Sequence, residues 1–292
     1  MKRFFRALAV VGMTAGALSI SACAPTAKNT QASLAQEQAN ARKLVAQMES
    51  KDALIKDKSL NAYVRGIMSR VAAQRPKGSV PLNTYIVKDG DVNAFTVGGG
   101  YVFFNAGMIA AMENEAQLAS VAAHEIGHID RGHIQAGQAN RTGVQLGAAL
   151  AGIAGAALGV PGQLTNLAVN LGANYAVNSF TRTQETDADN TGVRYLAGAG
   201  YNVIEGAKSF EVLRRLYGDS KGPSAAFFSS HPPSSERQAN LTAQARQLGA
   251  TKGRVAPNTY DSKTARIRKN VLKFYDANGR SKEAAQIRRN LR

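Results

Sequence analysis

Apolar residues recur every three or four positions between residues 60 and 71, and this spacing predicts an amphipathic helix with one buried face. The members of this stripe are Leu60, Tyr63, Val64, Ile67, Met68 and Val71. The segment RPKG (75–78) ends the helix, because proline cannot continue it and glycine favours a turn. A first helical pattern precedes this one, after a small and polar stretch at residues 24–33.

Two short runs rich in β-branched and aromatic residues predict strands at LNTYIVK (82–88) and GYVFF (100–104). The stretch NAFTVGGG between them is expected to be a loop that ends in a glycine-rich turn. Apolar residues from Leu118 to Ile126 then predict a helix, with Asn114 as its N-cap and Gln117 completing a capping box. These elements predict an α+β fold, mainly α, with a small sheet beside this helix.

The segment between Arg141 and Arg182 contains no charged residue. Its part 143–160 is long enough to suggest a transmembrane helix, but it consists mostly of small residues and ends at a Pro-Gly pair. We therefore expect residues 143–181 to form a close-packed helical hairpin, with a membrane-touching or lid role as the alternative.

The 292-residue chain carries 36 lysines and arginines against 20 aspartates and glutamates, a formal net charge of +16. This balance suits an acidic partner such as nucleic acid or anionic lipid. Residues 1–22 begin with Lys2, Arg3 and Arg6, continue with a short apolar run and end in small residues, which is the pattern of an export signal. Export argues against nucleic acid as a partner and favours an anionic envelope surface.

The chain's one cysteine, Cys23, ends the stretch ISAC, which resembles the bacterial lipobox. We expect Cys23 to become the lipidated first residue of the mature chain, with residues 23–33 as a flexible tether. A plain signal peptide with a chance cysteine is the alternative. Ala24 stands where inner-membrane lipoproteins often carry aspartate, so the periplasmic face of the outer membrane is the expected location.

The end of the chain, residues 246–292, is strongly basic and shows two helical patterns joined by a turn at 277–279. This pattern predicts an αα-hairpin, a basic helical extension that follows a main domain at 34–245. Its charges are expected to form a solvated face, and contact with an anionic envelope surface is the alternative.

Three of the four histidines lie in the stretch HEIGHIDRGH (124–133). Its first five residues match H-E-x-x-H on a helix. Positions four apart differ by only about 40° around a helix, so His124 and His128 can bind one metal ion while Glu125 reaches a water at that ion. His133 lies about 180° from His124 on the same helix, so a structural or supporting role is expected for it.

A tetrahedral metal site with one open position needs a third ligand, either another histidine or a carboxylate. Glu185 and Asp189 lie one helical turn apart, so Glu185 can bind the metal while Asp189 orients a ligand histidine. Asp187 points about 200° away from Glu185 on such a helix. Substitution of Asp187 or His133 is therefore expected to leave the metal affinity close to wild type. A solvated acidic helix face is the alternative.

Four motifs, HEIGH, the later E-x-x-x-D, NAFTVGGGYVFFNAGMI and HPPSSER, resemble the gluzincin zinc peptidases of the family that includes HtpX and the CAAX prenyl endopeptidases. The resemblance covers residues 35–245 and implies a gluzincin-type metallopeptidase domain. Within that family, the short, lipidated, non-spanning architecture looks like the outer-membrane lipoprotein peptidases of the LoiP and BepA type. The basic C-terminal hairpin departs from the plain catalytic domain.

The resemblance implies one zinc ion per chain, held by His124, His128 and Glu185. Glu125 is implied to be the general base toward a metal-activated water. His231 and Arg237 are implied to face the tetrahedral intermediate; alternatively, His231 occupies the open zinc position in a resting enzyme. The strand implied to take the substrate by backbone pairing contains Gly100, Tyr101, Val102, Phe103 and Phe104.

These features favour a zinc endopeptidase that hydrolyses peptide bonds of misfolded or stalled envelope proteins. Its expected partners are those unfolded or misfolded polypeptides, and the membrane through the N-terminal lipid. A second hypothesis is an envelope chaperone or assembly factor whose peptidase site is mostly idle, and a third is a surface-binding module built on the basic C-terminus. The intact H-E-x-x-H favours the enzyme, because a binding module has no need of Glu125.

Overall fold

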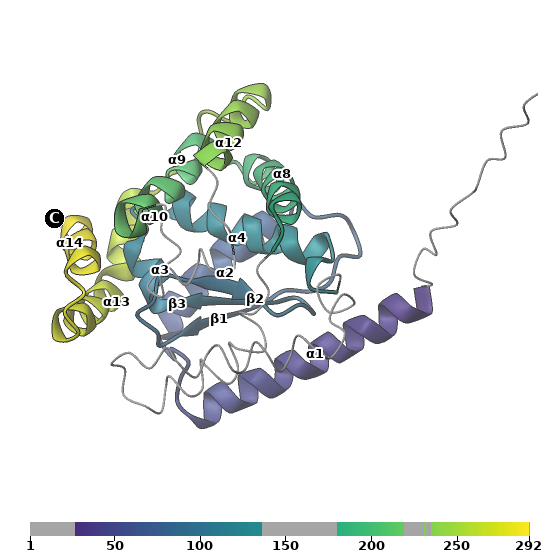
Figure 1. Cartoon of the computed structure of the whole chain (residues 1–292), viewed down its shortest axis with the longest axis horizontal. Helices are drawn as coiled ribbons and strands as arrows, with labels where there is room; N and C mark the ends of the chain where they lie inside the picture. Colours follow the sequence, from purple (N-terminus) through teal and green to yellow (C-terminus); the bar gives the residue numbers. More distant parts are fainter. Residues whose placement is uncertain (1–26, 136–179, 219–230, 232–234, 292) are drawn as a thin grey trace, which may run out of the picture.

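The computed structural model describes residues 27–135, 180–218, 231 and 235–291, whose arrangement is shown in Figure 1. The helices are α1 (Ala27–Ser50), α2 (Lys58–Ala72), α3 (Ala106–Ala111), α4 (Glu115–Asp130), α8 (Arg182–Gly198), α9 (Val203–Ala207), α10 (Ser209–Tyr217), α12 (Ser235–Gln247), α13 (Pro257–Ala277) and α14 (Ser281–Asn290). The strands are β1 (Asn83–Val87), β2 (Ala94–Thr96) and β3 (Tyr101–Asn105). The expected mainly helical α+β fold is confirmed.

Several expectations concern parts of the chain outside the described residues. These are the signal peptide at 1–22, Cys23 and its lipidation, and the proposed hairpin, of which residues 143–179 are not described. Among the helices that the structure describes, none combines the length and the apolar character that a membrane crossing requires.

Strand β3 is the centre of a three-stranded sheet with the order β1-β3-β2. It runs parallel to β1, with Asn83 opposite Tyr101, and antiparallel to β2, with Phe95 opposite Phe103. The two predicted strands are confirmed to within a residue, but the expectation that everything between them is a loop was wrong, because Ala94–Thr96 forms β2. Three residues are too few to show a pattern of alternation in the sequence.

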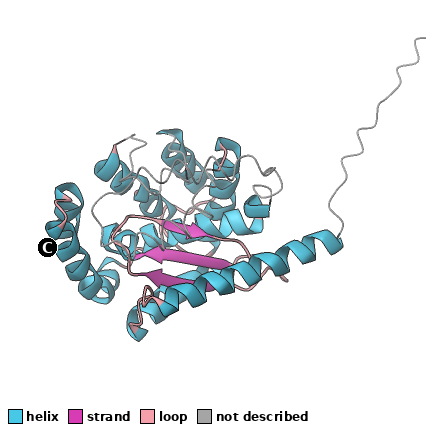
Figure 2. Ribbon diagram, turned by 60° about the horizontal axis from the view of Figure 1, so that its bottom comes forward, coloured by secondary structure: helices cyan, strands magenta, loops and turns pink. Residues whose placement is uncertain are grey.

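The side chains of β3 alternate between the two faces of the sheet, and both faces are covered. Tyr101 and Phe103 lie in a small apolar cluster with residues of α1, whereas Val102 and Phe104 belong to the main core with α2 and α4. Figures 1 and 2 show the long helix α1 along one face of the sheet and α2 and α4 on the other side. The sheet therefore lies directly beside the H-E-x-x-H helix.

Helix α1 begins at Ala27, so residues 27–33 are helical where a flexible tether was expected. The stretch from Ala27 to Ser50 contains neither glycine nor proline and is rich in alanine and glutamine, which favour helices. Leu44 and Met48 anchor its second half against the sheet. The predicted end of the tether at residue 33 is therefore wrong.

The predicted start of the H-E-x-x-H helix is confirmed. The side chain of Asn114 accepts a hydrogen bond from the backbone N–H of Gln117 at 3.0 Å, as an N-cap does. The reciprocal bond differs from the expected capping box, because the Gln117 side chain accepts the N–H of Glu113, at 2.8 Å, one residue before the cap. The helix start is thus fixed by its own sequence.

Helices α4 and α8 cross so closely at two glycines that no side chain fits between them. A Cβ atom at Gly127 would lie 2.6 Å from the carbonyl oxygen of Ala188, and one at Gly192 would lie 2.9 Å from the backbone of Ala123. This approach lays the first turns of α8, which carry Glu185, against the end of α4 that carries the histidine pair.

The C-terminal helices α13 and α14 form the predicted hairpin, and they pack into the main core. The Tyr260 hydroxyl donates to the carbonyl of Ile109 at 2.6 Å, and the buried Arg268 guanidinium donates to the carbonyl of Met112 at 2.9 Å. Exposed basic residues such as Lys269 lie on the outer side. The extension is therefore part of the same core.

A buried carboxylate, Glu115 at the start of α4, ties three parts of the chain together. It accepts hydrogen bonds from the hydroxyls of Tyr63 (2.6 Å) and Tyr201 (2.7 Å), and the Arg254 guanidinium pairs with both of its oxygens. Burial alone would raise the pKa of Glu115, but the hydrogen bonds from Arg254, Tyr63 and Tyr201 hold it below its usual value. The ionised form is therefore the one that stabilises the fold.

Replacing Glu115 by glutamine is expected to lower the free energy of unfolding at pH 7 by about 3 kcal/mol, because it leaves buried donors without their charged acceptor. A lowered folded-state pKa means that this stabilisation is present above the unfolded value of 4.5 and is lost as the pH falls through the folded value. The difference in the free energy of unfolding between wild type and Glu115→Gln should thus be smaller in acid. Urea unfolding at pH 7 and pH 3 measures it, and Glu49→Gln, an exposed change on α1, is the control. A difference independent of pH would contradict the assignment.

Candidate metal centre

Four buried side chains from three places in the sequence bring their donor atoms together. One atom from each lies within 4.8 Å of all the others, and the four residues are His124, His128, Glu185 and His231. His124 and His128 are four positions apart on α4, and their Nε2 atoms lie 3.0 Å from each other. Glu185 comes from α8, with its Oε1 3.2 Å from His128 Nε2.

The predicted third partner, Glu185, is thus in the group, and His231 joins it as a fourth. His231 Nδ1 lies 2.9 Å from Glu185 Oε1 and 3.1 Å from His124 Nε2. His231 is 1% exposed, so it is part of the interior of the site. Neither Asp187 nor Asp189 reaches the group with a donor atom.

The remaining acid of the H-E-x-x-H motif, Glu125, is fully buried beside this group. Neither of its carboxylate oxygens has a hydrogen-bond partner in the described part of the chain, and its nearest charged neighbour is His231, with Nε2 3.4 Å from Oε1. Burial raises the pKa of Glu125, against the opposing effect of His231 and His124. A buried carboxylate without a hydrogen bond from the described residues is the kind of group that a bound water, ion or substrate satisfies.

The protonation preferences of the group fit a metal ion. Burial would raise the pKa of Glu185, but the neighbouring His231 and His124 imidazoles bring it below its ordinary value. Burial also lowers the pKa of His128 well below its usual value. An ionised carboxylate and a neutral imidazole are the forms that bind metals. Imidazole nitrogens with one carboxylate oxygen form a donor set that suits zinc.

Asp189 lies behind His124, as the sequence predicted. Its Oδ1 is 2.8 Å from His124 Nδ1, so it can accept the ring N–H and leave Nε2 for the ligand group. Burial would raise the pKa of Asp189, but the Arg237 guanidinium and His124 lower it.

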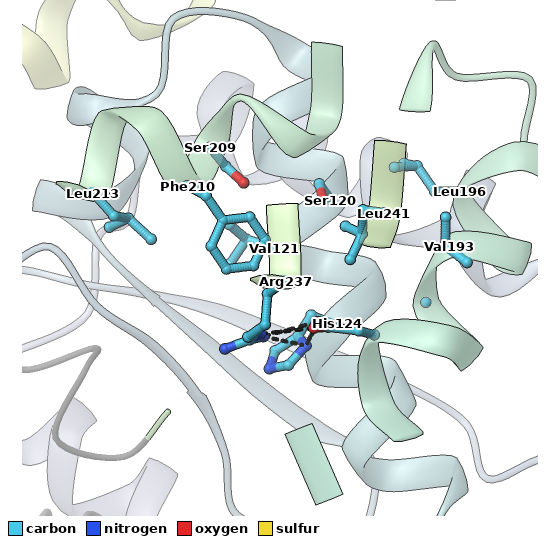
Figure 3. Close-up of a pocket in the computed structure, with 12 residues that line it drawn as sticks. Ser120, Val121, His124, Val193, Leu196, Ser209, Phe210, Leu213, Arg237 and Leu241 are labelled. Atoms are coloured by element: carbon cyan, nitrogen blue, oxygen red, sulfur yellow. Dashed lines mark hydrogen bonds and ion pairs between the residues drawn. The ribbon is translucent and has the colours of Figure 1, made fainter. Parts of the chain in front are cut away.

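Arg237, implied by the resemblance to face the tetrahedral intermediate, contacts two buried carboxylates of the site. Its guanidinium donates to both oxygens of Asp189, at 2.7 and 2.8 Å, and forms a close ion pair with Glu185 Oε2 at 2.5 Å. It is 5% exposed and rests on the ring of Phe210. Two buried carboxylates capture the guanidinium, because an unpaired buried charge is costly. Figure 3 shows the Arg237 guanidinium beside the ring of His124, whose Nδ1 lies 3.3 Å from Arg237 Nη2.

An apolar pocket adjoins this arrangement on the side of α10 and α12 (Figure 3). Its lining comes from four helices and includes Val121, Val193, Phe210, Leu213 and Leu241. His124 and Arg237 supply its polar edge. Arg237 and Asp189 are both buried, and the low dielectric of such surroundings strengthens their ion pair.

His133 was expected to have a structural or supporting role and Asp187 to point away from Glu185, and the structure places both at the border of the site. Helix α4 ends at Asp130, so the helical angle of His133 no longer applies, and His133 Nδ1 lies 2.9 Å from His128 Nδ1. Asp187 in turn approaches His133 Nε2 at 3.5 Å. His133 thus contacts a ligand histidine, as a supporting role requires, and Asp187 reaches the site only through His133.

Sequence reasoning missed one further side chain. The ring of Phe180 stacks on the imidazole of His128, with the ring centroids 3.7 Å apart and an interplanar angle of 26°. Phe180 is the large apolar residue just before the capping residue Thr181 of α8, and that position was the only available signal. Its ring shields His128 from solvent.

The expectation that the strand at residues 100–104 takes the substrate was wrong. A strand can accept a new partner only along an unpaired edge, and β3 is paired on both sides. No described strand pairs with the outer edge of β2, and β2 also contacts α4. Within the described sheet, β2 is therefore the edge nearest the metal-ligand helix.

Replacement of Arg237 by alanine is expected to weaken zinc binding by about 10- to 100-fold, as loss of a residue that supports metal ligands usually does. It would leave Glu185 and Asp189 as neighbouring buried carboxylates without a counter-charge. The zinc affinity of Arg237→Lys should lie between those of wild type and Arg237→Ala, because one ammonium cannot contact both carboxylates as the guanidinium does. Competition with a chromophoric chelator measures the affinities. Unchanged zinc affinity with reduced turnover would instead place Arg237 on the substrate.

A buried group of imidazoles and a carboxylate on an H-E-x-x-H helix, with the motif's glutamate unpaired beside it, defines the class of metal-dependent hydrolases. The chain belongs to peptidase family M48, whose profile matches residues 55–245. Helix α1 and the C-terminal hairpin lie outside this match.

Similar proteins come from bacteria and from a yeast. A putative beta-barrel assembly-enhancing protease of Vibrio cholerae is 31% identical over 73% of this chain and 45% of its own length. The metalloprotease LoiP of Escherichia coli K12 is 31% identical over 55% of this chain and 62% of its own. The mitochondrial metalloendopeptidase OMA1 of Schizosaccharomyces pombe is 29% identical over 60% of this chain and 50% of its own length. The chain thus spans less than two thirds of each of these relatives.

Proposed function

We propose that the protein is a zinc-dependent endopeptidase that cleaves unfolded or misfolded polypeptides of the bacterial envelope. The observation that carries this proposal is Glu125, a fully buried carboxylate without a hydrogen-bond partner in the described residues, beside the group of His124, His128 and Glu185. Burial of a carboxylate without a hydrogen bond destabilises the fold. A purely structural site would therefore not contain such a group, whereas a catalytic site can use it as a base.

The chemistry of the site divides between the metal and the protein. When bound, zinc supplies Lewis-acid polarisation of the scissile carbonyl and of the attacking water. Glu125 accepts the proton from that water and delivers it to the leaving nitrogen. The raised pKa of Glu125 makes it a stronger base than an exposed glutamate. Asp189 and Arg237 hold the ligands in place from behind.

His231 is proposed to be the fourth donor of the resting site, because its Nδ1 lies among the ligand atoms. Substrate must then displace this imidazole. The other role, a hydrogen-bond donor to the charge that develops on the carbonyl oxygen, would need His231 beside the metal and outside the ligand group. The observed distances favour the resting-ligand role.

The outer edge of β2 is proposed to take the substrate as an added strand. Backbone hydrogen bonds at such an edge do not depend on side chains, which suits a broad preference for unfolded chains. Phe95 of β2 is half-buried and stacks on Phe103 at 5.0 Å between centroids, so the edge rests on the core.

The N-terminal sequence and the relatives support a proposal for the location and biological role. We propose a lipid anchor at Cys23 and a place on the periplasmic face of the outer membrane. Relatives named beta-barrel assembly-enhancing protease support a role in envelope protein quality control. The exposed basic face of the C-terminal hairpin is proposed to contact an anionic envelope surface. The second candidate function is an assembly factor with a mostly idle peptidase site.

Cleavage of unfolded casein by the zinc-loaded protein, with loss on chelation and recovery on adding zinc, tests the proposal. The Glu125→Gln variant is the matched control for a contaminating protease. If the zinc-loaded protein and this variant suppress aggregation of an unfolded protein equally and neither cleaves it, the assembly-factor function holds and the peptidase is excluded. His231→Ala then separates the two roles of that residue: cleavage rises if His231 is a resting ligand and falls if it is a donor.

Replacement of Cys23 by alanine is expected to release the protein from the membrane fraction into the periplasm, because a lipid chain attached to the thiol can no longer form. Fractionation of cells that express each form measures this. Ser21→Ala, which leaves the cysteine in place, is the control. Membrane attachment that persists in Cys23→Ala would exclude the lipid anchor.

A further inference from the structure

Both histidines of α4 turn one ring nitrogen toward the ligand group and the other toward an outer partner. The Nε2 atoms of His124 and His128 face each other at 3.0 Å inside the group. On the outer side, His124 Nδ1 meets a carboxylate oxygen of Asp189 at 2.8 Å, and His128 Nδ1 meets the Nδ1 of His133 at 2.9 Å. A carboxylate behind a ligand imidazole is the common arrangement. A second imidazole is not, and two facing ring nitrogens must share one proton.

We propose that His133 and Asp187 form a positioning pair that holds His128 in its metal-binding orientation, an inference that rests on the proposed zinc site. If His128 Nε2 is to offer its lone pair to a metal, the ring proton must be on Nδ1. His133 Nδ1 must then accept that N–H, so His133 carries its own proton on Nε2. This nitrogen lies 3.5 Å from Asp187 Oδ2, which can accept it. Each contact from His128 to Asp187 thus has one donor and one acceptor.

The local structure holds this pair in place. Helix α4 ends at Asp130, and Gly132, with φ of 65°, takes the left-handed conformation that turns the chain back. His133 is consequently 6% exposed and packed against the site. Arg131, from the same turn, donates to Asp187 from Nε at 2.8 Å and from Nη2 at 2.5 Å. The turn therefore supplies both the imidazole and the group that fixes its carboxylate.

Helix α8 thereby supplies an acid for each part of the site. Glu185 belongs to the ligand group, Asp189 supports His124 directly, and Asp187 supports His128 through His133. The second path is weaker in two respects: its acceptor is a neutral imidazole, and its carboxylate side chain is 34% exposed. Loss of the His133 acceptor should therefore weaken zinc binding by about 10-fold, the lower end of the usual range for residues that orient metal ligands. Asp189→Asn should have the larger effect.

Two substitutions of His133 separate a positioning role from simple packing. His133→Phe keeps a ring but has no acceptor, whereas His133→Asn loses the ring and can place an amide oxygen where Nδ1 stood. If His133 positions His128, the zinc dissociation constant rises about 10-fold in His133→Phe and stays within about 3-fold of wild type in His133→Asn. If His133 only fills space, the zinc dissociation constant rises more in His133→Asn, which loses the ring, than in His133→Phe, which keeps one.

The measurement is zinc competition with a chromophoric chelator on the whole protein, together with the visible spectrum of the cobalt-substituted form, which reports the environment of His128. Asp276→Asn, which breaks an exposed pair with Arg288 on the C-terminal hairpin, is the control and should match wild type. If His133→Phe does not fold, His133→Ala takes its place as the variant without an acceptor. Equal affinities for wild type and the variant without an acceptor, or weaker binding in His133→Asn, would overturn the proposal. Failure of the wild-type protein to bind zinc would instead reject the proposed metal site.

Discussion

Glu125→Gln is expected to retain zinc and to lose peptide hydrolysis by at least ~10²-fold, which is the contribution typical of a general base. The amide keeps the size of the side chain but cannot accept a proton from water. Glu125 does not belong to the ligand group, and its oxygens make no hydrogen bonds within the described residues, so the substitution removes no ligand. The loss should thus appear in kcat, with zinc stoichiometry unchanged.

Glu125→Asp is the informative companion of this variant. It keeps the carboxylate and shortens its reach, so hydrolysis should be reduced but remain above that of Glu125→Gln. Turnover on an unfolded substrate, measured beside the zinc content of each preparation, provides the test. Near-normal hydrolysis by a zinc-loaded Glu125→Gln would defeat the mechanism, because another group would then have to take the proton.

Glu185→Ala is expected to lose most of the bound zinc and all peptidase activity. Glu185 is the carboxylate of the ligand group, and its removal leaves three imidazoles without an anionic ligand. It also leaves the buried Arg237 guanidinium, now 2.5 Å from Glu185 Oε2, with one carboxylate fewer beside a dication site. Both effects oppose metal binding, and the uncompensated buried charge also destabilises the fold.

A graded series around Glu185 makes this expectation sharper. Asp189→Asn should keep the metal with affinity reduced about 10- to 100-fold, because it disturbs the orientation of His124 and removes no ligand. Asp276→Asn should match wild type. Metal analysis after dialysis against a weak chelator ranks the variants, and thermal unfolding of the metal-free forms shows whether each one folds. Stoichiometric zinc in Glu185→Ala would show that the ligand group is assigned wrongly.

The revised position of Arg237 changes how the site is stabilised. An arginine that faces the substrate would contribute only while the peptide reacts. An arginine that contacts Glu185 and Asp189 contributes to the resting site, because it balances two buried negative charges before any metal or substrate binds. The three close contacts make Arg237 a support for the ligands, and its place 113 residues after His124 in the sequence gave no hint of this.

The sequence alone determined the features that depend on a few neighbouring residues. The cap at Asn114, the spacing of His124 and His128 on one helical face, and the two strands around the glycine-rich turn all arise from local periodicity and local hydrogen bonds. Such patterns need no knowledge of the rest of the chain. The common face of Glu185 and Asp189, which Asp187 does not share, belongs here too, because it follows from helical angles.

Only the tertiary structure decided which faces and edges meet. β3 lies in the centre of the sheet because β2, too short to be recognised, pairs with it. Arg237 contacts Glu185 and Asp189 because the tertiary structure brings α12 against α8. His133 reaches His128 because Gly132 ends the helical path that the sequence pattern would have continued. In each case the outcome depends on a contact between segments far apart or on the residue where an element ends, and local periodicity contains neither.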